Sequence, residues 1–192
     1  MIFLTFGTGL GAGLILNGEL YSGTNGMAGE AGHIRLAEDG PVGYGKEGSF
    51  EGFCSGGGIA QLGQVMAEEA LDREEIPSFC QSKGELFKVN ARTIAEAAEK
   101  GDPLALKIYD IVADRLGQGL AILVDLLNPE KIVIGSIFLR QEKLLRPRME
   151  KILNKEALDQ SLSVVEVVPA GLGEKLGDYA AVSVGLRAYQ KK

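Results

Sequence analysis

The run Thr5-Phe-Gly-Thr-Gly-Leu-Gly-Ala-Gly13, followed by Leu14-Ile-Leu-Asn-Gly18, is the most informative part of this chain. Its alternating glycines would let a ligand approach bare backbone N–H groups. Dinucleotide-binding folds also use a Gly-x-Gly spacing, but they need a helix directly after the glycines. Here the glycines lead into an apolar run and Asn17-Gly18, a strong hairpin signal. The stretch therefore predicts a strand, a glycine turn and a hairpin, with phosphate-binding amides at Thr8, Gly9, Leu10 and Gly11.

The alternative for this motif is a tight turn between two packed strands, with glycine present for steric reasons alone. Seventeen of the 27 glycines lie at or before Gly58, so close approach to the backbone is concentrated in the first third of the chain. This distribution favours a ligand-binding interpretation.

Composition is that of an ordinary globular domain. The 192 residues are 45% hydrophobic and 24% charged, with a net charge of −6, and the length suits one domain or one large lobe of a larger protein. The basic residues are scattered, so the electrostatic footprint of a nucleic-acid-binding protein is absent. No apolar run is long enough to span a membrane, no signal peptide precedes the first strand, and Cys54 and Cys80 lack metal or redox spacing. We expect a reduced, cytoplasmic protein without a nucleic-acid or membrane partner.

Apolar periodicity and helix-terminating residues predict alternating strands and helices along the chain. Asp102-Pro103 is expected to start the longest helix, because aspartate caps helices and proline suits the first helical position. Gly117 and Gly119 lie inside that helix, where close packing is their expected use. We expect an α/β sheet covered by helices, with strands over 2–6, 33–37, 131–135 and 163–169, a hairpin to residue 21, helices over 58–71, 90–100, 103–128, 141–158 and 179–189, and a long polar loop over 38–58.

Five motifs, in this order and spacing, resemble the ROK family (repressor, open reading frame, kinase), which includes bacterial glucokinases and sugar-responsive repressors. The motifs are Phe6-Gly-Thr-Gly-Leu-Gly-Ala-Gly13, Asn25-Gly-Met-Ala-Gly-Glu-Ala-Gly-His33, Gly45-x-x-Gly48-x-x-Glu51, Leu127-Asn-Pro-Glu-Lys-Ile-Val-Ile-Gly135 and Leu176-Gly-Asp-Tyr-Ala-Ala181. The resemblance implies an actin-like ATPase (ribonuclease H-like) lobe with a mixed sheet. Residues 1–192 would form the larger, C-terminal lobe, through which family members commonly pair, so we expect a homodimer.

The resemblance also assigns ligand contacts. Glu30 and His33, the only histidine, match residues that bind sugar hydroxyls in the family, and Glu51 matches a second sugar-binding glutamate. Solvated loop carboxylates and a structural histidine are the alternative interpretation. ATP with Mg²⁺ would be the cofactor and a hexose the substrate. The nucleotide would contact Gly135 and Ser136, although Ser136 and Ile137 replace family glycines here.

Family members also carry a zinc loop, formed by that histidine and three cysteines. The corresponding cysteine positions hold Val42, Tyr44 and Ser49. Valine cannot bind zinc, and tyrosine and serine are poor ligands beside thiolates. We therefore predict that zinc is absent, with packing of Tyr44 and Phe50 as a candidate substitute. Cys54 is too far along the chain to replace a ligand and is expected to be a small buried hydrophobe.

Two family elements do not occur in these 192 residues: the Asp-x-Gly-x-Thr phosphate loop and the Asn-Asp pair that carries the catalytic aspartate. The chain therefore holds no expected catalytic base. The resemblance implies part of an ATP-dependent hexose kinase of the glucokinase class, in which an absent N-terminal lobe supplies the base and a Mg²⁺ ligand. The alternative is a non-catalytic sugar-sensing or dimerisation domain of a ROK-type repressor. Because the zinc loop is important to many repressors, its loss favours the kinase.

Overall fold

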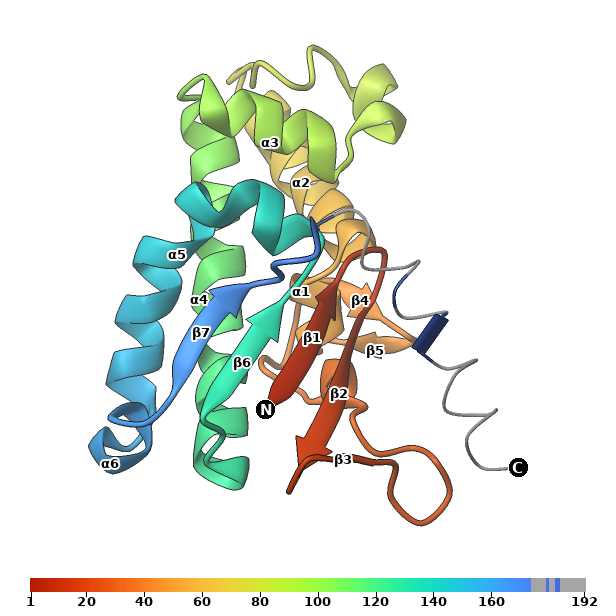
Figure 1. Cartoon of the computed structure of the whole chain (residues 1–192). Helices are drawn as coiled ribbons and strands as arrows, with labels where there is room; N and C mark the ends of the chain where they lie inside the picture. The colour runs from red at the N-terminus through yellow and green to blue at the C-terminus, as the bar shows by residue number, and fades with distance from the viewer. Residues whose placement is uncertain (174–178, 180–181, 184–192) are drawn as a thin grey trace.

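A computed structural model of the chain describes residues 1–173, 179, 182 and 183. The strands of its central sheet are β1 (Ile2–Phe6), β2 (Leu10–Leu16), β3 (Glu19–Tyr21), β6 (Lys131–Ile134) and β7 (Glu166–Pro169). They lie side by side in the order β3-β2-β1-β6-β7 (Figure 1). β2 is antiparallel to both β1 and β3, whereas β1, β6 and β7 are parallel. The expected mixed sheet is confirmed. A separate two-stranded sheet contains β4 (Val42–Gly43) and β5 (Lys46–Glu47).

Helices cover one face of the central sheet, and Figure 1 shows α4 and α5 behind its strands. The helices are α1 (Phe50–Phe53), α2 (Gly56–Asp72), α3 (Ala91–Glu99), α4 (Pro103–Leu127), α5 (Ile137–Glu156) and α6 (Asp159–Leu162), with 3₁₀ segments η1 (Ala31–His33) and η2 (Lys83–Lys88). Within the described residues, no helix combines the length and apolar character needed to cross a membrane.

The predicted hairpin and the start of the long helix are confirmed. Asn17 and Gly18 have positive φ angles of 52° and 81°, which the tight turn between β2 and β3 requires. The Asp102 carboxylate accepts hydrogen bonds from the N–H groups of Leu104 and Ala105, at 3.0 and 2.9 Å, and thereby caps α4.

Close packing explains both glycines inside α4. A Cβ on Gly117 would lie 2.6 Å from the Met149 carbonyl oxygen, and a Cβ on Gly119 would overlap the buried ring of Phe50. The first contact joins α4 to α5, and the second joins α4 to α1. The expected use of these glycines is therefore confirmed.

Several predicted boundaries are wrong. Residues 33–37 are not a strand: η1 takes the beginning of this segment, and Arg35 makes only an isolated bridge to Ser49. The loop expected over 38–58 contains β4, β5 and α1, and α2 begins within it at Gly56. The helix expected from Gln141 begins at Ile137 instead, because α5 continues across a kink at Gln141.

Two further expectations concern the end of the chain. The strand expected over 163–169 begins at Glu166, after the short helix α6. Apart from Tyr179, Val182 and Ser183, the helix expected over 179–189 lies outside the described residues, as does most of the motif at 176–181.

Candidate functional site

The glycine turn between β1 and β2 lies against the start of α2. The Gly7 N–H donates to the Gly9 carbonyl at 3.0 Å, and the Gly7 carbonyl accepts from the Gly56 N–H at 2.8 Å. Ser55 caps α2 by accepting from the Gly58 N–H at 3.0 Å. The N-terminal end of a 17-residue helix, which favours anions, therefore sits beside the turn.

The four amides predicted to bind phosphate differ in their availability. The Leu10 N–H donates to Glu51 Oε2 at 2.9 Å, and the Gly11 N–H donates to Thr5 Oγ1 at 3.1 Å. Within the described residues, the N–H groups of Thr8 and Gly9 have no recorded hydrogen-bond partner. The turn therefore presents Thr8 and Gly9 as its two free donors.

The Glu51 side chain is packed among glycines from three segments. A Cβ on Gly9 would lie 2.8 Å from Glu51 Oε2, and Cβ atoms on Gly32 and Gly43 would lie 3.1 and 2.8 Å from Glu51 Cβ. The half-buried glutamate thus joins the glycine turn, η1 and β4. Any larger residue at these glycines would have to displace it.

Glu30 precedes η1 and His33 is its last residue, and both residues are exposed. The segment that carries them is tied to β2, because the Gly29 carbonyl accepts from the Ala12 N–H at 2.7 Å. Gly32 lies between them, against Glu51 and the Leu10 carbonyl. The structure therefore brings the two predicted sugar-binding motifs together, although it records no direct contact between the side chains of Glu30, His33 and Glu51.

The positions that correspond to zinc ligands do not fit a metal. The Tyr44 side chain is 89% exposed, and its ring meets the edge of the His33 ring at a centroid distance of 6.4 Å. Ser49 is fully buried, and its hydroxyl accepts from the Gly52 N–H at 3.0 Å as the cap of α1. Val42 offers only a hydrocarbon side chain. Within the described residues, no group of three or more histidine, cysteine or acidic side chains could hold a metal ion.

Hydrogen bonds from side chains to the backbone hold the loop that contains β4 and β5. Gln61 of α2 pairs with both backbone groups of Val42, and Arg35 donates to the Glu38 and Glu47 carbonyls at 3.3 and 2.8 Å. Lys46 Nζ donates to the His33 carbonyl at 2.8 Å. Packing of Tyr44 and Phe50 was the expected substitute for zinc. Phe50 is buried, as this requires, but Tyr44 is not.

Gly135 and Ser136 lie beside the glycine turn, at the carboxyl end of β6. The Gly135 N–H donates to the Leu4 carbonyl at 3.0 Å, and Ser136 Oγ lies 3.2 Å from the position of a Cβ on Gly7. Ser136 has φ 58° and ψ −111°, a conformation that costs a residue with a Cβ about 1–3 kcal/mol. The predicted phosphate and nucleotide segments therefore meet at one edge of the sheet.

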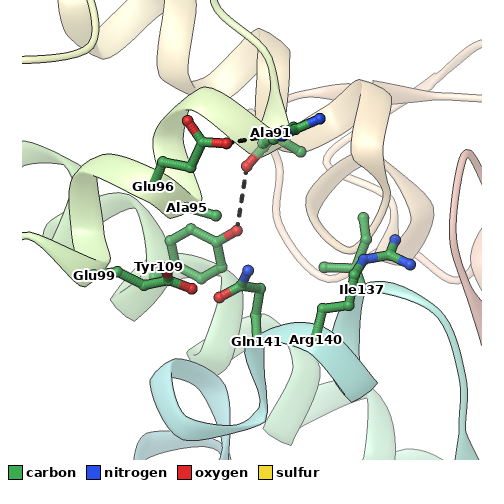
Figure 2. A pocket seen from close by; sticks show the side chains of 9 residues that line it. Ala91, Ala95, Glu96, Glu99, Tyr109, Ile137, Arg140 and Gln141 are labelled. Carbon is green, nitrogen blue, oxygen red and sulfur yellow. Dashed lines mark hydrogen bonds and ion pairs between the residues drawn. The ribbon is translucent and has the colours of Figure 1, made fainter.

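A cavity of about 640 Å³ opens at the start of α5, next to Ser136. Figure 2 shows Tyr109 of α4 against α3, with Ile137, Arg140 and Gln141 from the start of α5 beside it. The Tyr109 hydroxyl donates to the Ala91 carbonyl at 3.4 Å, and burial raises the pKa of this phenol above its usual range. The cavity has no local signal in the sequence, because α3, α4 and α5 together line it, and α5 begins at Ile137 rather than at the predicted Gln141.

Cys54 contributes no chemistry to the site. Cys54 is fully buried, its thiol donates to the Val112 carbonyl at 3.7 Å, and burial raises the pKa of the thiol well above its usual value. A neutral buried thiol is a poor nucleophile and a poor metal ligand. The expectation of a small buried hydrophobe is confirmed for Cys54.

Comparison with known proteins reveals two kinds of relative. A model described as ROK family matches residues 1–184. A glucokinase from Halalkalibacterium halodurans is 34% identical over 180 residues, which cover 92% of this chain and 53% of the relative. The DNA-binding transcriptional dual regulator NagC from Escherichia coli is 33% identical over 179 residues, covering 91% of this chain and 41% of the relative. The chain thus spans about half the length of these proteins.

The solved structures that resemble this chain also include both a kinase and a transcriptional regulator. A ROK family glucokinase from Streptomyces griseus, in complex with glucose and AMPPNP, aligns with a TM-score of 0.74 and 28% identity, covering 91% of this chain and 56% of its own. A ROK family transcriptional regulator, a homologue of the Escherichia coli MLC protein, aligns with a TM-score of 0.72 and 27% identity, covering 88% of this chain and 41% of its own.

Proposed function

This chain belongs to the ROK family and has the actin-like ATPase fold, and from that premise we propose that it is the hexose-binding larger lobe of an ATP-dependent sugar kinase of the glucokinase class. One observation carries the proposal: Glu51 of the sugar motif bonds directly to Leu10 of the glycine turn. Sugar and phosphate sites must be adjacent for a phosphoryl group to pass between them.

On the sugar side, Glu30, His33 and Glu51 would hold the hydroxyl groups. A carboxylate accepts two hydrogen bonds, and an imidazole donates or accepts, so the three groups can orient one face of a hexose. Glu30 and His33 are exposed and therefore accessible to a sugar. Glu51 Oε2 accepts from the Leu10 N–H, and Oε1 would accept from a sugar hydroxyl.

On the nucleotide side, the free N–H groups of Thr8 and Gly9 would receive phosphate oxygens, assisted by the N-terminus of α2. Gly135 and Ser136, with the adjoining cavity, would hold the nucleoside end. ATP with Mg²⁺ would supply the transferable phosphoryl group. The glucokinase from Streptomyces griseus, solved with glucose and AMPPNP, supports this choice of ligands.

We propose no catalytic base among the described residues of this site. We therefore expect the 192 residues alone to show no sugar kinase activity in a coupled assay with ATP and a panel of hexoses, because loss of a general base alone costs roughly 10²–10⁴-fold. A chain that also carries the N-terminal lobe implied by the family resemblance should be active. Turnover by the 192 residues that disappears in Glu30→Ala would contradict this division of roles.

A direct test of the sugar site is titration with glucose, mannose and N-acetylglucosamine, followed by NMR. We expect weak binding, because the chain spans about half the length of its relatives and small ligands need most of their surface buried. Glu30→Ala should abolish the sugar-induced shifts, whereas Glu38→Ala, an exposed glutamate outside the site, should retain them. Unchanged shifts in Glu30→Ala would remove this residue from the site.

The second candidate function is a sugar-sensing or dimerisation domain of a transcriptional repressor. NagC is almost as similar to this chain as the glucokinase is, at 33% against 34% identity. Genomic DNA immediately upstream of Met1 distinguishes the two. An in-frame Asp-x-Gly-x-Thr and an Asn-Asp pair would indicate a kinase, and a helix-turn-helix would indicate a repressor.

We also propose that the protein forms a homodimer. Leu20, Tyr21 and Met27 are each about half exposed on β3 and the loop after it, and apolar groups gathered on a surface are typical of interfaces. Analytical ultracentrifugation at micromolar concentrations should show a dimer, and a strictly monomeric mass would contradict this.

A further inference from the structure

The side-chain amide of Gln61 in α2 makes two hydrogen bonds to the backbone of β4. Its Oε1 accepts from the Val42 N–H at 3.0 Å, and its Nε2 donates to the Val42 carbonyl at 2.9 Å. This pairing satisfies the side of Val42 that faces away from β5, much as a neighbouring strand would. The residue therefore fixes β4 to a long helix that is itself packed in the core.

From β4, contacts continue to Glu51. The Gly43 carbonyl accepts from Ser49 Oγ at 3.4 Å, and a Cβ on Gly43 would lie 2.8 Å from Glu51 Cβ. β4 thus forms one wall of the space that the Glu51 side chain occupies. The opposite side of that space is the glycine turn, where Glu51 Oε2 accepts from the Leu10 N–H.

We propose that Gln61 is a positioning residue for the ligand site, acting through β4 on Glu51 and the glycine turn. This inference rests on the proposed function in so far as Glu51 is a sugar ligand. Gln61 itself touches no part of the site: it contributes by holding Val42–Gly43 against Glu51. With its side-chain amide, Gln61 attaches the loop that contains β4 and β5 to α2, as a bound structural metal ion would.

Hydrogen exchange of the Leu10 amide, followed by NMR in the 192-residue chain, reports the Glu51–Leu10 bond without any sugar. Gln61→Met keeps the length of the side chain but removes both bonds to Val42. We expect exchange of this amide to become about 3–10-fold faster, as expected when one or two ordinary hydrogen bonds are lost. The dissociation constant for glucose should rise by a similar factor.

Gln64→Met is the matched control. Gln64 lies on the same helix and donates to the Val89 carbonyl at 3.3 Å, away from the site, so this variant should change neither measurement. Gln61→Glu keeps an acceptor for the Val42 N–H but loses the donor, and should restore part of the Leu10 protection.

The outcomes separate this inference from the proposed function. If Gln61→Met leaves Leu10 exchange unchanged, or speeds it while glucose affinity stays the same, the positioning role is wrong. If the wild-type chain binds no sugar, the proposed function is wrong, and the predicted effect of Gln61 on glucose affinity is wrong with it. Exchange of the Leu10 amide still shows whether Gln61 positions Glu51.

Discussion

The Glu51 carboxylate accepts a hydrogen bond of 2.9 Å from the backbone N–H of Leu10, although 41 positions separate the two residues. The bond ties the glutamate of the proposed sugar site to the turn of the proposed phosphate site. It also leaves Leu10 unable to serve as a phosphate donor unless Glu51 moves. The two proposed binding functions are therefore linked through one side chain.

Glu51→Ala should lower the free energy of unfolding as well as remove sugar binding. The Leu10 N–H loses an ionised acceptor in a half-buried position, so we expect a loss of about 1–2 kcal/mol in urea denaturation. Glu51→Gln, which keeps an acceptor oxygen, should lose less. Equal stability of wild type and Glu51→Ala would mean that the bond to Leu10 contributes nothing.

Ser136→Gly should make the protein more stable. Ser136 has φ 58° and ψ −111°, a conformation that glycine adopts without the steric cost of a Cβ. After allowing for the greater freedom of glycine in the unfolded chain, we expect a gain of about 0.5–1 kcal/mol. Ser136→Ala keeps the Cβ and should give no gain, so a similar gain in both variants would exclude backbone strain as the cause.

Gly117→Ala should destabilise the protein, although alanine is the better helix former. The new Cβ would lie 2.6 Å from the Met149 carbonyl oxygen and 2.7 Å from Ile152 Cβ. Forcing α4 and α5 apart should cost about 1–3 kcal/mol, measured by thermal or chemical unfolding. Gly84→Ala is the control, because a Cβ on Gly84 would lie 3.8 Å from Ser82 Oγ, an ordinary van der Waals contact. A stabilised Gly117→Ala variant would show that the helices separate easily.

The purified protein should contain no zinc after dialysis, and a chelator should leave its unfolding temperature unchanged. The reason is the chemistry at Val42, Tyr44 and Ser49, together with the side-chain bonds that hold the loop. Elemental analysis that found about one zinc per chain would refute this and require ligands of another kind.

The cap of α4 should make stability depend on pH. Burial works against ionisation of Asp102, but hydrogen bonds from the N–H groups of Ala105 and Ser78, among others, outweigh it and hold the pKa of this carboxyl below its usual value. A carboxyl with a lowered pKa in the folded state stabilises the protein above its usual pKa. That contribution is lost as the pH falls below about 4.

The comparison that tests this is wild type against Asp102→Asn. Asparagine also caps helices but does not ionise. The difference in free energy of unfolding between the two should stay constant from about pH 7 to pH 5 and shrink below about pH 4. A difference that does not vary with pH would show that the charge of Asp102 plays no part.

Elements with local signals could be predicted from the amino-acid sequence. Asn17-Gly18 specifies a turn that needs two positive φ angles, and Asp102-Pro103 starts α4 with a cap bond that spans only two or three residues. Short apolar runs that end at a glycine placed β1 and β6 for the same reason, because such runs are properties of short segments. The motifs also identified the family.

Features that depend on distant partners could be seen only in the folded chain. Residues 33–37 have the composition of a strand, yet Arg35 finds only a single bridge, to Ser49, so no ladder forms. Gln61 reads as an ordinary surface residue of a helix until β4 is placed beside it. Ser136 adopts a strained backbone because β6, α5 and the glycine turn meet there. In each case the determining contact joins segments far apart in the chain, and such contacts leave no periodic or local signal in the sequence.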